Sequence, residues 1–106
     1  MAIKNTAIPA TTNTAIYTSS GDNAITTIIV CNTTGAAINL TLYAVANNGG
    51  AVGTPADGNM IVKTLSVPAG DTVSFDQEKV VLSNNDTITA YASAVGLTAT
   101  VSTLAV

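Results

Sequence analysis

The chain has no histidine, no arginine and no tryptophan, and it contains one cysteine, Cys31. Without arginine it lacks the usual side chain for bidentate phosphate recognition, and its three lysines are scattered, so we expect no nucleic-acid partner. The missing histidine also removes the ligand set that transition metals need. A lone cysteine forms no internal disulfide, and Cys31 is better interpreted as a small buried residue of a core strand than as a reactive thiol.

Charge is also scarce, at 8% of the residues, with three lysines against six acidic residues. An ordinary globular domain has roughly a quarter of its residues charged. Threonine, asparagine and serine must therefore provide most of the polar surface. Few charges need to lose their water when two such surfaces meet, so contact between neighbouring copies costs little.

Long apolar runs are absent as well. None reaches the roughly 18 residues that a membrane-spanning helix needs, so we expect no membrane partner. The first residues, Met-Ala-Ile-Lys-Asn-Thr, lack the charged-then-apolar pattern of a signal peptide. Asn32, Asn39 and Asn85 each begin an Asn-x-Ser/Thr sequon, which we interpret as a chance product of a composition rich in threonine and asparagine.

The chain is instead rich in β-branched residues, most densely in the stretch Ala24–Asn32. Such side chains favour a pleated, half-buried surface over a helix. From Ile28 to Cys31 both faces are apolar, which predicts a strand in the middle of a sheet, with packing above and below. We expect the other strands to gather around this one.

Strand signals recur along the rest of the chain. The clearest is Ile38–Ala46, where Leu40 and Leu42 point one way and Thr41 and Tyr43 the other. Turn signals recur about every eight to twelve residues, and no stretch has helical periodicity. The pattern predicts an all-β fold, an antiparallel two-sheet β-sandwich, and leaves immunoglobulin-like and jelly-roll topologies open. The further expected strands are Ala15–Thr18, Met60–Val67, Thr72–Asp76, Val80–Leu82, Thr87–Ser93 and Leu97–Thr103.

We expect one domain over residues 1–106, with residues 1–14 as an extended N-terminal arm. Pro9 argues against a long regular strand there, and the arm lies along a sheet edge of its own subunit or reaches a neighbour. The segment Ala46–Asn59 is predicted to be the longest loop and the one freest to make outside contacts.

Three local features remain. Lys63 shares the strand phase of Leu65, which would direct a lysine into the core. Either a bulge shifts the register there, or the lysine lies at the rim of the sheet. The sequence Val67–Gly70 is typical of a type I turn leading into a hairpin. Ser83–Asp86 is typical of a tight turn after which the chain pairs back.

No residue pattern indicates catalysis. Asp76 and Glu78 lie two apart, but we interpret them as solvated carboxylates in a connection rather than as an acid–base pair. Asp57 and Asn59 offer oxygen atoms for calcium at a spacing that matches no known loop. We therefore predict no enzyme activity, no catalytic residue, no cofactor and no metal site.

Some residues are candidates for contacts between subunits. Ile3 and Ile8 could anchor the N-terminal arm, and Tyr43 and Tyr91 are predicted on outward strand faces, with Tyr17 as a third tyrosine to weigh. Tyrosine is enriched at interfaces. We favour an interface over a sugar platform, because carbohydrate sites usually combine aromatic residues with charged or amide groups in a concave pocket. A carbohydrate- or receptor-binding module is the alternative function.

Four stretches resemble a group of small virion proteins of marine tailed phages, cyanophages especially: Thr14–Thr18, Ala24–Asn32, Val67–Thr72 and Leu97–Ser102. The resemblance implies a β-sandwich virion structural protein present in many copies, in capsid decoration or in the tail or neck. It brings no catalytic residue. The implied partners are other copies and other virion proteins, with a host surface glycan less favoured, and the implied location is the virion, assembled in the host cytoplasm.

Overall fold

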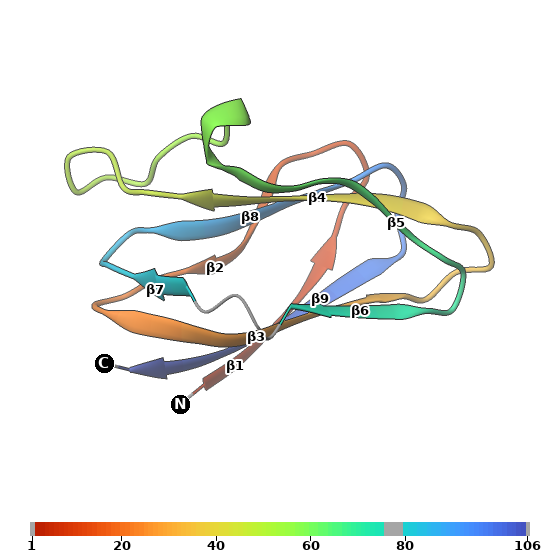
Figure 1. Ribbon diagram of the computed structural model, residues 1–106, viewed down its shortest axis with the longest axis horizontal. Helices are drawn as coiled ribbons and strands as arrows, with labels where there is room; N and C mark the ends of the chain where they lie inside the picture. The colour runs from red at the N-terminus through yellow and green to blue at the C-terminus, as the bar shows by residue number, and fades with distance from the viewer. Residues whose placement is uncertain (1, 76–79, 106) are drawn as a thin grey trace.

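The computed structural model describes residues 2–75 and 80–105, which form two β-sheets packed face to face (Figure 1). The only helical turn in this part of the chain is a short 3-10 segment, η1 (Asp57–Asn59). The predicted all-β antiparallel sandwich is confirmed. The strands are β1 (Ala2–Ile8), β2 (Thr14–Thr18), β3 (Asn23–Asn32), β4 (Ile38–Val45), β5 (Met60–Val67), β6 (Thr72–Phe75), β7 (Val80–Leu82), β8 (Thr87–Ala92) and β9 (Leu97–Ala105).

The strand order decides between the two topologies that the sequence left open. One sheet runs β1-β9-β3-β6, with β7 also paired to β3, and the other runs β2-β8-β4-β5. The antiparallel pairs β1–β9, β2–β8, β3–β6 and β4–β5 are those of one long hairpin folded over on itself. That nested pairing, with β9 joined to β3 and β8 to β4, is the connectivity of a jelly roll.

The strand β3 has the central place that its β-branched run predicts. It pairs with β9 along one edge and with β6 and β7 along the other. Ile28 and Val30 are buried in the core, but Ile29 on the opposite face is 39% exposed. The strand is therefore covered on one face, and the expected second packing layer over Ile29 is not present in the described structure.

The core lies between the two sheets and is built from alternate residues of the strands. The alternation predicted for β4 is confirmed, because Ile38, Leu40 and Leu42 are each at most 2% exposed. Full burial of one such side chain contributes roughly 2 kcal/mol to the free energy of unfolding. The core cluster also contains Ile8, Ile16, Ile25, Ile28, Val30, Val67, Leu82, Ile88, Ala90, Ala92, Leu97, Ala99 and Val101.

The first strand corrects the expectation that residues 1–14 contain no long regular strand. Residues Ala2–Ile8 form a regular strand that pairs with β9 without interruption, from Ala2–Thr103 to Ile8–Leu97. Pro9 does end this strand, but seven residues precede it. The segment therefore lies along a sheet edge of its own subunit, the first of the two alternatives.

The strand β5 contains a bulge, which was one of the two explanations for a lysine at position 63 in the core phase. Its register against β4 shifts between the Leu40–Leu65 and Leu42–Val62 pairs, so an extra residue of β5 is accommodated around Lys63 and Thr64. Thr64 has φ of +52°, an unusual conformation that fits a bulge. A second shift follows Leu42, and Ile61 is 49% exposed.

Two expected hairpins are wrong. The turn after β5 lies one residue later than predicted, closed by the hydrogen bond from Asp71 N to Pro68 O, with Gly70 at φ +70°. It leads from β5 in one sheet to β6 in the other. The Ser83–Asp86 turn forms as predicted, with Asn85 at φ +66°, but β7 and β8 also belong to different sheets. Turn residues reverse the chain, and they do not determine whether it stays in one sheet.

Within the described residues, no helix has the length and apolar character that crossing a membrane requires.

Candidate functional site

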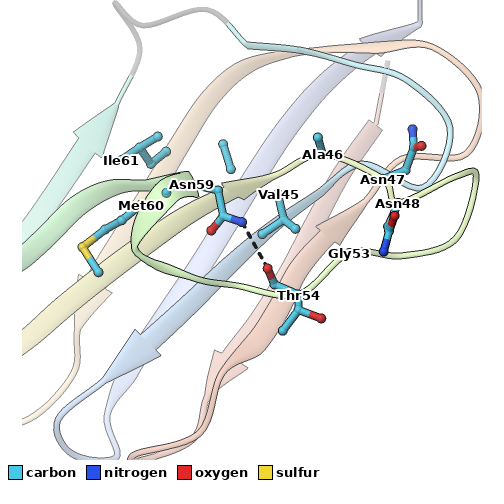
Figure 2. Close-up of a pocket in the computed structure, with 11 residues that line it drawn as sticks. Val45, Ala46, Asn47, Asn48, Gly53, Thr54, Asn59, Met60 and Ile61 are labelled. Atoms are coloured by element: carbon cyan, nitrogen blue, oxygen red, sulfur yellow. Dashed lines mark hydrogen bonds between the residues drawn. The ribbon is translucent and has the colours of Figure 1, made fainter.

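The loop between β4 and β5, residues 46–59, lies against the outer face of the β2-β8-β4-β5 sheet. In Figure 2 the loop backbone passes Val45 at Gly53 and Thr54, and it then continues to Asn59, Met60 and Ile61. Val45 lies in the outward phase of β4, yet it is 2% exposed. Between the loop and the sheet lies a shallow, open hollow of about 710 Å³, lined by small, aliphatic and amide side chains.

Hydrogen bonds hold this loop to the rest of the domain, while Val52 within it stays 54% exposed. Asn59 Nδ2 donates to Thr54 O at 3.1 Å, and Ala56 N donates to Asn59 Oδ1 at 2.9 Å. Asn85 Nδ2 donates to Gly50 O at 2.7 Å and so joins the loop to the β7–β8 turn. Two of the amide side chains lining the hollow, those of Asn47 and Asn59, are therefore engaged within the protein.

Asp86 is the main anchor between this loop and the turn. Its Oδ1 accepts hydrogen bonds from Asn47 N at 2.7 Å and from Asn47 Nδ2 at 3.0 Å. Its Oδ2 accepts one from Ser83 N at 2.8 Å. The backbone N–H groups of Asn47 and Ser83, aided by the Asn47 side chain, hold the pKa of Asp86 below its ordinary value, and partial burial opposes them.

This anchor predicts a pH dependence. Because the folded-state pKa of Asp86 is lowered, its stabilising contribution is present above the unfolded-state pKa of about 3.9 and is lost as the pH falls through the folded-state pKa. Asp86→Asn should lose about 2 kcal/mol of unfolding free energy at neutral pH and lose less below pH ~4, by urea denaturation at several pH values. Asp22→Asn, in an exposed turn, should change stability by less than about 0.5 kcal/mol. Equal effects of the two variants would contradict the assigned role of Asp86.

The described strands place no charged side chain on one broad face of the sandwich, the outer face of the β1-β9-β3-β6 sheet. On the outer face of the β1-β9-β3-β6 sheet the exposed and half-buried positions of β1, β9, β3 and β6 are Ile3, Asn5, Ala7, Thr98, Thr100, Ser102, Leu104, Thr27, Ile29, Cys31, Thr72 and Ser74. The charged residues within the described ranges lie instead in turns, in the 3-10 segment or on the edge strands β1 and β5: Lys4, Asp22, Asp57, Lys63, Asp71 and Asp86.

The outer face of the second sheet carries two of the tyrosines proposed for an interface. Tyr43 pairs with Thr89, and Tyr91 lies two residues further along β8, so the two rings are diagonal neighbours on one face. Both are half-buried. Tyr17 does not join them, because a bulge at Ile16 turns it toward the core, against which it packs.

The two isoleucines proposed for contacts lie in opposite environments. Ile3 is 71% exposed on the edge strand β1. Ile8 is 2% exposed and belongs to the core cluster, so it is not available as a surface contact. Its burial explains instead why β1 stays attached to the sandwich.

The two sheets part at the edge formed by β5, β6 and β7. An apolar cleft of about 300 Å³ opens there, lined by Ile28, Leu42, Ile61, Val62, Phe75 and Val80. Phe75 is half-buried at this cleft. This edge of the sandwich is therefore incompletely sealed.

The groups considered for chemistry are not brought together. Within residues 2–75 and 80–105, no three histidine, cysteine, aspartate or glutamate side chains form a cluster able to hold a metal ion. Cys31 is half-buried rather than buried, on the outer face of β3. Asp76 and Glu78 lie outside the described residues.

Sequence reasoning missed one structural residue, Asn32. It is fully buried, and its amide donates to Ala36 O at 2.8 Å and Val67 O at 2.9 Å while accepting from Thr34 N at 2.9 Å and Thr34 Oγ1 at 2.7 Å. Asn32 thereby ties the end of β3 to the end of β5 in the other sheet. Its position directly after the central apolar run was the available signal.

No protein-family model matches the chain, and no curated protein matches it. Among solved structures, the chain is similar to one from Bacillus endospore appendages, described as a family of disulfide-linked pili. The TM-score is 0.50 at 21% sequence identity, and the match covers 99% of this chain and 88% of the other. This likeness supports the sandwich fold over the whole chain.

Proposed function

We propose that this chain is a non-enzymatic structural subunit that assembles with copies of itself into a particle or filament. The observation that carries the proposal is the absence of charged side chains from the described strands on the outer face of the β1-β9-β3-β6 sheet. Such a face, rich in threonine and small side chains, can meet another copy without desolvating ions. Self-association therefore needs no specific charge match over this face.

The likeness to a pilus subunit supports an appendage role and also indicates a difference. That protein is described as disulfide-linked, whereas these 106 residues contain one cysteine. One thiol joins two chains and cannot extend a polymer. Assembly of this chain therefore depends on non-covalent contacts.

For placement we propose a phage virion, as capsid decoration or as part of the tail or neck, on the basis of the sequence resemblance to small virion proteins. The jelly roll suits this role, because viral capsid domains use the same architecture. Mass spectrometry of purified particles tests the placement, and the genes beside the reading frame separate capsid from tail. Absence of the chain from every particle, with a pilus-like fibre formed instead, would contradict it.

The alternative function, a carbohydrate- or receptor-binding module, has one supporting observation. Tyr43 and Tyr91 lie side by side on an outer face. A glycan array tests this function directly. A reproducible sugar ligand that is lost on Tyr43→Ala and on Tyr91→Ala, but kept on Tyr17→Phe, would favour the alternative over the structural role.

A further inference from the structure

The edge strand β1 is built to accept another strand. Its seven residues keep one unbroken register with β9, and no other strand of the described chain pairs with its second edge. In an antiparallel pair every second residue directs its backbone N–H and C=O away from the partner strand. A regular edge of this kind is a template for pairing with a strand of another chain.

Both edge strands of the second sheet contain register shifts, whereas the pairing of β1 contains none. The strand β5 has two register shifts and Thr64 at φ +52°. The strand β2 has a shift between Ala15 and Tyr17. Bulges of this kind are a device by which proteins protect edges from unwanted pairing. The far edge of the first sheet is shared by two short strands, β6 with four residues and β7 with three, and β6 is regular over the Ile28–Phe75 to Cys31–Thr72 pairs.

The directions of the strands make β6 a suitable partner for β1 of another copy. Neighbouring strands in the order β1-β9-β3-β6 are all antiparallel, so β6 runs opposite to β1. A second copy in the same orientation therefore presents its β6 antiparallel to β1 of the first. This contact joins two different surfaces, so it repeats along a filament instead of closing on a dimer.

Side-chain phase, the overlap of the whole of β6 with β1, and charge together select one register. Ile3 and Asn5 face outward on β1, as Thr72 and Ser74 do on β6, and a one-residue slip would reverse the faces. Lys4 is the positive charge on β1, and Asp71 is a negative charge directly before β6. The pairing of Ile3 with Ser74 and Asn5 with Thr72 keeps the faces continuous and sets Lys4 diagonally across from Asp71.

We propose that copies of this chain polymerise by adding β1 of one copy to β6 of the next in this register. The inference rests on the proposed self-assembly and assigns to it an edge-to-edge contact in addition to the uncharged outer face. The incoming copy also covers the apolar cleft at the edge of β6, where Phe75 is half-buried and Ile61 is 49% exposed. Covering this cleft gives the contact a hydrophobic component besides its backbone hydrogen bonds.

Cysteine cross-linking tests the register. In a Cys31→Ser background, Ile3→Cys combined with Ser74→Cys should give a ladder of disulfide-linked multimers on mild oxidation, because directly opposed Cβ atoms lie roughly 5 Å apart. Ile3→Cys with Ser66→Cys, on the bulged strand β5, is the matched control and should give no ladder. A dimer from Ile3→Cys alone would show β1 pairing with β1 and would overturn the proposal.

Charge reversal gives a second measurement that does not depend on thiols. Lys4→Glu should raise the concentration needed for assembly about tenfold, because like charges then face each other across the contact. Lys63→Glu makes the same change of net charge on β5 and should have no effect. The double variant Lys4→Glu with Asp71→Lys should recover assembly.

The outcomes separate this inference from the proposed function. If the unmodified chain assembles but gives no ladder and responds equally to Lys4→Glu and Lys63→Glu, the β1–β6 contact is wrong and self-assembly stands. If the unmodified chain does not assemble at any concentration, both are wrong.

Discussion

Asn32→Asp should destabilise the fold by about 3–5 kcal/mol, a large part of the roughly 5–15 kcal/mol that stabilises a domain of this size. The substitution keeps the shape of the side chain but replaces the donor Nδ2 with an oxygen that faces Ala36 O and Val67 O, at the 2.8 Å and 2.9 Å now occupied by hydrogen bonds. A buried carboxylate against two carbonyl groups has no compensating partner.

Urea denaturation measures this effect, and the chain supplies a matched control. Asn39 is exposed on β4, so Asn39→Asp makes the same chemical change and should alter the free energy of unfolding by less than about 0.5 kcal/mol. Burial and the facing carbonyls raise the folded-state pKa of the carboxyl introduced at position 32, so its penalty should shrink as the pH falls toward about 4. Equal stability of the two variants would contradict the role assigned to Asn32.

Gly53→Ala should cost about 2 kcal/mol and detach the loop 46–59 from the sheet. An added Cβ at Gly53 would meet the backbone oxygen of Ala46 and approach Val45 Cγ1 to 2.9 Å. Because Ala46 O belongs to the backbone next to β4, the loop must move away instead. Val45, now 2% exposed, would then lose its cover.

Hydrogen exchange at the amides of Asn47 and Gly50, combined with thermal unfolding, reports both effects. Gly58→Ala, in the same loop, is the control, because nothing lies within 4 Å of its added Cβ. It should leave exchange and stability nearly unchanged. If Gly53→Ala behaves like Gly58→Ala, the loop does not pack on Val45 as described.

Local patterns in the sequence predict the strands well, because side-chain alternation and turn residues act over a few neighbours. The alternation in β4 and the β-branched run of β3 need no distant information. The pairing of the strands does, since the jelly roll joins segments as distant as Asn5 and Thr100, 95 residues apart, whose side chains are hydrogen-bonded. For the same reason the sequence alone indicates a loose arm where the first strand in fact pairs with the last.

The candidate surfaces are predicted less completely. The outward direction of Tyr43 and Tyr91 follows from alternation, whereas the inward turn of Tyr17 depends on a bulge that has no clear signature in the sequence. The network around Asn32 joins β3 to β5 and the one around Asp86 joins a turn to a loop 39 residues away. Such contacts appear only once the sheets are stacked.

Analytical ultracentrifugation of the purified chain, over a wide range of concentration and at low and high salt, tests the proposed self-assembly most directly. We expect species that grow with concentration and weaken only modestly at high salt, since Lys4 and Asp71 form the one charge pair assigned to the contact. A single monomeric species at every concentration would contradict it.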